Sequence, residues 1–154
     1  YGHFSLRIAG TRMQTVISSS LQQQIFEQME AGYPNEVGGF LLGSLEKDSI
    51  TVREIIQIEN VFEAEEQFHR YAMTPQDWMK LEDQADERGL TLVGYYHSHP
   101  DSPAIASIYD RDHALPNFTY IITSVVKGKA VDQKVWRLRD DRSQFDEGTL
   151  TVNT

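Results

Sequence analysis

The chain has 154 residues, of which 40% are hydrophobic and 24% are charged, and this is the length and composition of one globular domain. It has no cysteine, which excludes disulfides, thiolate catalysis and sulfur-ligated metal sites. A formal net charge of −9 would repel a phosphate backbone, so neither nucleic acid nor an anionic membrane is an expected partner.

Targeting segments are not evident in the sequence. No apolar run approaches the roughly 20 residues that a membrane-spanning helix needs. The start, YGHFSLRIAG, lacks the basic and apolar regions of a signal peptide. We therefore expect a cytoplasmic protein with a single domain over residues 1–154, in which residues 1–10 are a flexible segment or an expression remnant.

The first third of the chain predicts a strand, a helix and a hairpin. TRMQTVIS (11–18) alternates as a strand does, and SSLQQQIFEQMEAG (19–32) has the spacing of an amphipathic helix, with a serine cap and a terminal Gly32. Two further segments follow: EVGGFLLGS (36–44), which is apolar with paired glycines, and SITVREIIQIEN (49–60), which is rich in β-branched residues. They predict a hairpin whose loop is LEKD.

The rest of the chain predicts a second helix and more strands. The helix is MTPQDWMKLEDQADERG (73–89), which starts with a threonine cap before proline and ends in glycine. LTLVGYYHSHP (90–100) is apolar enough for a buried central strand. FTYIITSVV (118–126) and QKVWRLR (133–139) predict a hairpin, and GTLTV (148–152) predicts an edge strand. The expected fold is α/β or α+β, with a mostly antiparallel, curved sheet against two or three helices.

One polar stretch, HSHPDSPAIASIYD (97–110), interrupts this pattern. His97 and His99 are two apart at the end of a predicted strand, so their side chains project from one face. Ten residues separate His99 from Asp110, enough for a loop to return a carboxylate to the same point. Two imidazoles and a carboxylate are three ligands for a metal, and an open fourth position is typical of hydrolytic sites. A polar loop without a metal is the competing interpretation.

Two further residues have side chains suited to hydrolysis. Ser107 is three residues before Asp110, so one helical turn would place its hydroxyl beside the carboxylate. The same spacing is also that of a helix N-cap and its N3 acid. A water nucleophile needs a base, and Glu36, just before VGGFLLG, is the best candidate, although a glutamate alone is usually a surface residue.

The arrangement of these residues resembles the JAMM (MPN, or Mov34) metalloprotease family. The family pattern is a distant glutamate, then H-x-H-P, then S-x-x-D, and here Glu36, GYYHSHP and SIYD match it. The likeness extends from about the first helix to VWRLRDDRSQF, and its compact form resembles the bacterial and archaeal members. Ala106 stands where family members often have proline.

The resemblance implies roles for each matching residue. His97, His99 and Asp110 would bind one zinc ion per chain, with water as the fourth ligand. Glu36 would be the general acid and base, and Ser107 would stabilise the oxyanion. The implied fold is the JAMM/MPN architecture, which is similar to that of cytidine deaminases.

The resemblance also implies a substrate: a ubiquitin-like or sulfur-carrier protein that ends in diglycine, with an E1-like activating enzyme as a further partner. The predicted activity is therefore that of a zinc peptidase or isopeptidase cutting after that diglycine. The main alternative is an MPN-type domain that binds a partner protein without catalysis. A deaminase is disfavoured because no cysteine is available for its zinc, and a DNA-repair role is disfavoured by the charge of −9.

Overall fold

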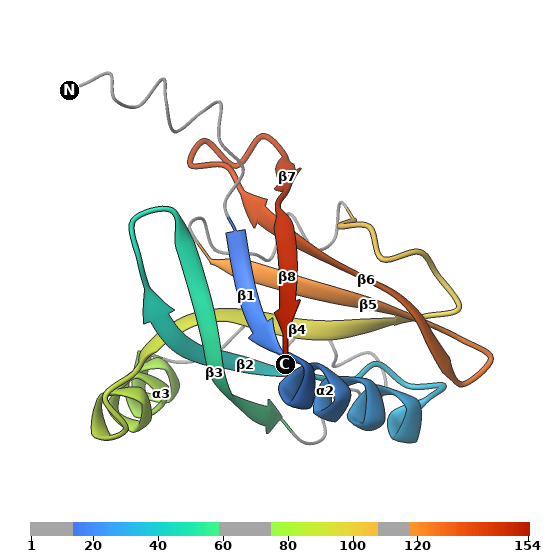
Figure 1. The fold of residues 1–154 in the computed structure, drawn as a ribbon, viewed down its shortest axis with the longest axis horizontal. Helices are drawn as coiled ribbons and strands as arrows, with labels where there is room; N and C mark the ends of the chain where they lie inside the picture. Colours follow the sequence, from blue (N-terminus) through green and yellow to red (C-terminus); the bar gives the residue numbers. More distant parts are fainter. Residues whose placement is uncertain (1–13, 59–74, 108–117) are drawn as a thin grey trace.

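The computed structural model describes residues 14–58, 75–107 and 118–154, and these contain eight strands and two helices (Figure 1). The elements in chain order are β1 (Gln14–Ser18), α2 (Ser19–Gly32), β2 (Gly38–Leu45), β3 (Ser49–Ile58), α3 (Pro75–Glu87), β4 (Thr91–Pro100), β5 (Thr119–Val126), β6 (Lys129–Leu138), β7 (Phe145–Glu147) and β8 (Thr149–Asn153). The segments 1–13, 59–74 and 108–117 lie outside the described residues.

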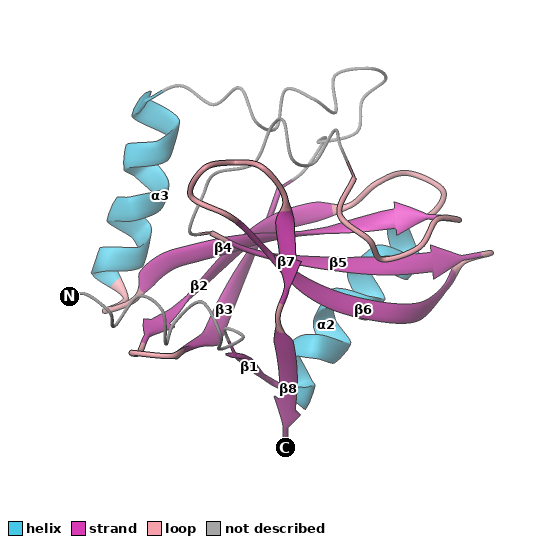
Figure 2. Ribbon diagram, turned by 90° about the horizontal axis from the view of Figure 1, so that it is seen from above, coloured by secondary structure: helices cyan, strands magenta, loops and turns pink. Residues whose placement is uncertain are grey.

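All eight strands form one curved sheet in the order β7-β6-β5-β4-β2-β3-β1-β8. Strand β8 also contacts β6, so the two ends of the sheet approach each other and the sheet is nearly a barrel (Figure 2). The described residues form an α+β domain, as expected.

The sheet is mixed, with antiparallel pairings in the majority, as expected. Strand β4 runs parallel to β5, and β1 runs parallel to both β3 and β8, while the other four pairings are antiparallel. The segment between β4 and β5 is long enough to cross over and return in the same direction, which a tight hairpin cannot do.

Both predicted helices are confirmed where the structure describes them. In α2, the Ser18 hydroxyl accepts a hydrogen bond from Leu21 N at 3.1 Å, which is the expected N-cap. Its last residue is Gly32, because Tyr33 adopts extended backbone (φ −56°, ψ 139°), the conformation favoured before proline. After α3, Gly89 has a φ of +70°, the left-handed conformation expected beyond a helix end.

The hairpin predictions are also confirmed, but one strand was missed. Strands β2 and β3 pair antiparallel, and a register shift at Gly43 makes the bulge for which a bare backbone is needed, since a Cβ there would lie 1.9 Å from Thr51 O. Strand β7 lies in the segment between the predicted hairpin and the predicted edge strand, where no strand was predicted. Its three residues pair with the end of β6. A segment as short as this is a strand only because it pairs with its neighbour.

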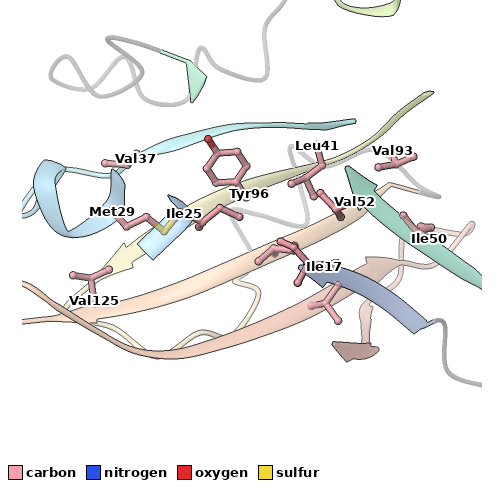
Figure 3. Close-up of a cluster of buried hydrophobic side chains, with 12 residues drawn as sticks. Ile17, Ile25, Met29, Val37, Leu41, Ile50, Val52, Val93, Tyr96 and Val125 are labelled. Carbon is pink, nitrogen blue, oxygen red and sulfur yellow. The ribbon is translucent and has the colours of Figure 1, made fainter. Parts of the chain in front are cut away.

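The core consists of two clusters on the two faces of the sheet. The first packs α2 against the sheet through buried residues that include Ile17, Ile25, Met29, Tyr96 and Val125 (Figure 3). The second includes Phe40, Leu81, Tyr95, Tyr120 and Leu138 and involves α3 through Leu81. Successive residues Tyr95 and Tyr96 therefore enter different clusters, as alternation along a strand requires. Neither described helix is long and apolar enough to span a membrane.

Burial in the first cluster predicts that substituting two different methionines will change the free energy of unfolding by different amounts. Met29 of α2 is 0% exposed and Met79 of α3 is 57% exposed. Met29→Ala should lower the free energy of unfolding by about 2–5 kcal/mol, because it leaves a cavity. Met79→Ala should change it by no more than about 0.5 kcal/mol. Urea unfolding of both variants measures the difference, and equal losses would contradict this packing of α2.

Candidate active site

The two histidines lie at the end of β4, which is paired with β2 on one edge and β5 on the other. Their rings face the same side of the strand, with centroids 5.0 Å apart and planes inclined by 58°. His97 is 1% exposed, and His99 is half-buried. The predicted histidine pair is therefore brought together on a strand held from both sides.

The surroundings of His97 are aromatic and tightly packed. The Tyr95 ring lies 5.7 Å from the His97 ring, and both belong to the face of the sheet that carries the second cluster. Across the ladder, Gly38 is paired with His97. A Cβ on Gly38 would lie 2.6 Å from Tyr95 Oη, so only glycine fits opposite this histidine.

The ring orientation of His99 is set by the loop that follows. Nδ1 of His99 lies 2.8 Å from the carbonyl oxygen of Pro103. A carbonyl only accepts, so this contact assigns the ring proton to Nδ1 and the acceptor lone pair to Nε2. A hydrogen bond from the second ring nitrogen to a carbonyl is the usual partner of a metal-binding histidine, because it fixes both tautomer and orientation.

The same loop is held by hydrogen bonds to successive residues. The Ser124 hydroxyl donates to Ser102 O at 2.6 Å, and the Trp136 indole donates to Ala104 O at 3.1 Å. Ala104 is itself buried. These contacts order the chain from the histidines almost to Ser107, so the loop does not depend on a proline at position 106.

The carboxylate of Asp101 joins three segments of the chain. It accepts a hydrogen bond from the Tyr33 hydroxyl at 2.6 Å and from Lys127 N at 2.9 Å, while Asp101 N donates to Val125 O at 2.7 Å. The bond from Tyr33 lowers the pKa of Asp101, and it raises the pKa of the Tyr33 hydroxyl. Residues at the end of α2 are thereby attached to the loop that follows His99.

The sheet register indicates where Glu36 lies. Ser98 N donates to Val37 O at 2.9 Å, so the β2–β4 pairing extends one residue beyond Gly38. Continued by one more residue, this register sets Glu36 opposite His99, and residues opposite each other share a face. Val37 packs in the first cluster with α2, so alternation also directs the half-buried Glu36 to the face of the two histidines.

Of the remaining predicted site residues, the structure describes Ser107 but not Asp110. Ser107 is exposed and is the last residue of the loop that the structure describes before residue 118. Asp110 lies outside the described residues, as do His3, His69 and His113. Among residues 14–58, 75–107 and 118–154, no three His, Asp or Glu side chains gather in a group that could hold a metal. The structure thus brings two of the three expected ligands together.

Several supporting residues were not foreseen. Ser98, Asp101, Ser124 and Trp136 all hold the site through hydrogen bonds. Ser98 and Asp101 lie inside the polar stretch itself, so their position beside the histidines was a usable signal. Nothing in the local sequence points to Ser124 or Trp136, because their partners are 22 and 32 residues away.

A groove of about 850 Å³ opens between α2 and the last residues of β3. Its lining is mostly carboxamide and aliphatic: Gln24, Glu27, Gln28, Ala31, Gly32, Asn35, Val37, Ile55, Gln57 and Ile58. It reaches Asn35 and Val37, the two neighbours of Glu36. In the described chain, the pairing of β1 with β3 covers only Ser49, Ile50 and Thr51 of β3. No described strand pairs with the continuation of that edge of β3, residues 52–58.

Comparison with known proteins places these features in a family. A family model of the prokaryotic homologs of the JAB domain matches residues 18–139. A desampylase from Haloferax volcanii is 35% identical over 92 residues, which are 59% of this chain and 63% of that protein. The matched part of the chain therefore spans less than two thirds of this relative.

Solved structures agree with the family model. The solution structure of a protein from Salinibacter ruber is 34% identical, with a TM-score of 0.67 and 91% of each chain covered. The crystal structure of a JAB1/MPN domain protein from Archaeoglobus fulgidus has a TM-score of 0.56 and covers 91% of this chain and 97% of its own. Its 21% identity shows a shared fold alone. With 122 of its residues, 18–139, matched by the family model, the chain belongs to the Prok-JAB family, the prokaryotic homologs of the JAB domain.

Proposed function

We propose that this protein is a zinc-dependent peptidase or isopeptidase that hydrolyses the bond after the C-terminal diglycine of a ubiquitin-like or sulfur-carrier protein. The observation that supports it most directly is the His97–His99 pair, with Glu36 opposite it in the sheet register. The likeness to a protein named desampylase supports an isopeptidase acting on a ubiquitin-like protein.

The donor atoms fit zinc. Two imidazole nitrogens and one carboxylate oxygen suit a borderline metal, and the tautomer of His99 presents Nε2 as the ligand atom. Asp110 is the third ligand in this proposal. When bound, zinc supplies a Lewis acid that makes water nucleophilic near neutral pH.

Glu36 and Ser107 have separate roles in the proposed hydrolysis. The Glu36 carboxylate accepts a proton from the attacking water, whose oxygen forms a bond to the carbonyl carbon of the terminal glycine. The Ser107 hydroxyl donates a hydrogen bond to the carbonyl oxygen as negative charge develops there. Glu36 then returns the proton to the leaving amine, the C–N bond breaks, and a carboxylic acid and an amine result.

The groove beside Glu36 offers a place for the substrate tail. Main-chain groups of residues 52–58, on the edge with which no described strand pairs, can pair with an extended peptide, and the carboxamides of Gln24, Gln28 and Gln57 can bond to its remaining amides. The groove lies on the α2 side of the sheet, and its lining includes Asn35 and Val37, the sequence neighbours of Glu36. We therefore propose that the tail enters along this groove and that its diglycine, having no side chains, turns toward the histidines.

Metal content and cleavage together test the mechanism. The purified protein should contain about one zinc per chain by elemental analysis, and it should cleave a fusion in which the diglycine of a ubiquitin-like protein is joined to a reporter. A chelator should abolish cleavage. Glu36→Gln should lower kcat about 10²–10⁴-fold while zinc stays bound, because it removes the base and no ligand.

The matched control is Glu46→Gln, which makes the same charge change in the exposed β2–β3 loop and should leave kcat unchanged. Zinc without cleavage would favour the partner-binding alternative over the enzyme. A folded protein that contains no zinc would overturn the metal site.

A second test concerns the groove. Ala31 is an exposed groove residue on α2, and Gln23 is an exposed residue of the same helix outside the groove. Ala31→Arg should raise KM for the fusion about 10-fold, roughly 1.4 kcal/mol, with little change in kcat, because it obstructs binding and not chemistry. Gln23→Arg should change neither constant. Equal effects of the two variants would place the tail elsewhere.

A further inference from the structure

We propose that Ser98 and Asp101 are positioning residues that hold the segment 33–37, and with it Glu36, in register with the histidine pair. The inference rests on the proposed function for its catalytic consequence, but its structural part is independent of the substrate. Both residues belong to the histidine stretch: Ser98 lies between His97 and His99, and Asp101 follows two residues later.

Ser98 fixes the end of the segment that joins β2. In a regular antiparallel ladder, the two residues of a hydrogen-bonded pair exchange two main-chain hydrogen bonds. Here Ser98 N donates to Val37 O at 2.9 Å, but Val37 N donates at 2.8 Å to the Ser98 hydroxyl, which takes the place of the Ser98 carbonyl. Ser98 is 1% exposed, so water cannot readily replace this hydroxyl. The side chain of Ser98 thus sets the spacing between β4 and the residue next to Glu36.

Asp101 fixes the other end. Its carboxylate accepts the Tyr33 hydroxyl at 2.6 Å and Lys127 N at 2.9 Å. Its backbone has a φ of 54°, a left-handed conformation that aspartate tolerates better than most residues, and this conformation turns the chain directly after β4. Because Asp101 N also donates to Val125 O at 2.7 Å, the carboxylate is anchored to β5 as well as to its own loop.

The consequence is a short segment attached at both ends to the strand that presents the histidines. Glu36 is three residues from Tyr33 and one from Val37, so neither end can move without moving the glutamate. A general base must lie within hydrogen-bond reach of the proton it takes, and a displacement of about 1 Å can lower a rate about 100-fold. The two hydrogen bonds therefore act on catalysis by positioning Glu36, and neither side chain needs to touch the substrate.

The test compares Ser98→Ala with Ser98→Thr, which retains a hydroxyl. Ser98→Ala should lower kcat for the diglycine fusion about 10- to 100-fold, with KM and zinc content unchanged. The Val37 amide should lose its protection from hydrogen exchange in the same variant, while the Leu41 amide in the middle of β2 keeps it. Ser98→Thr should restore both kcat and the protection of Val37.

Two more variants complete the design. Ser44→Ala removes a hydroxyl that accepts from Arg53 at the far end of β2, and it should change neither kcat nor the exchange of Val37. Tyr33→Phe removes the donor to Asp101 without altering β4, so it tests the second attachment even if Ser98→Ala unfolds. It should lower kcat with KM and zinc content unchanged.

The outcomes are distinct. A Ser98→Ala or Tyr33→Phe protein that is folded and keeps the wild-type kcat would overturn the positioning role, and so would a fall in kcat that Ser98→Thr does not reverse. If the wild-type protein cleaves nothing, the proposed function fails instead. In that case, hydrogen exchange at the Val37 amide still tests the structural part of the proposal. Equal exchange rates of this amide in Ser98→Ala and in the wild-type protein would overturn that part.

Discussion

The site depends on the pairing of β4 along both of its edges. Strand β2 lies antiparallel on one side and pairs as far as His97, while β5 lies parallel on the other side and pairs as far as Pro100. A strand held in this way cannot shift or twist independently. His97 and His99 consequently project from a rigid part of the molecule, which is the arrangement that a metal site with few ligands requires.

Alternation along β4 gives this one strand two purposes. Tyr96 points toward α2, where it packs in the first cluster and its hydroxyl donates to Gln28 at 2.6 Å. Burial raises the pKa of this hydroxyl, which therefore stays protonated as a donor. Tyr95 and His97 point to the other face, toward the cluster that contains Leu81 of α3. Successive side chains of a strand point to opposite faces, so the side chains on one face of β4 contribute to stability and those on the other face form the candidate site.

The loop after β4 extends this order beyond the sheet. Three successive carbonyls, those of Ser102, Pro103 and Ala104, face the side chains of Ser124, His99 and Trp136. Loops that present functional groups commonly rely on such contacts, because an unrestrained loop would lose conformational entropy whenever it adopted the reactive geometry. The same contacts explain how alanine is accommodated at position 106 without loss of order in the preceding residues.

Local pattern was sufficient for much of the fold. Helices α2 and α3, the β2–β3 and β5–β6 hairpins and the central position of β4 were all predicted, because each has a clear hydrophobic period and clear end signals. The direction of β5 relative to β4 and the existence of β7 were not, because both depend on which strands become neighbours. No local period encodes that choice.

For the site, the sequence by itself determined which side chains are available and predicted their chemistry, and the tertiary structure decided the geometry of those that it describes. The types and spacing of Glu36, His97, His99, Ser107 and Asp110 already indicated a hydrolytic metal centre. Only the folded chain relates Glu36 to His99, since 62 residues separate them and it is the register of β2 against β4, continued two residues beyond Gly38, that sets one opposite the other. The supporting bonds of Ser98, Asp101 and Trp136 likewise required the structure, because hydrogen bonds between distant segments depend on three-dimensional proximity, which a linear pattern does not contain.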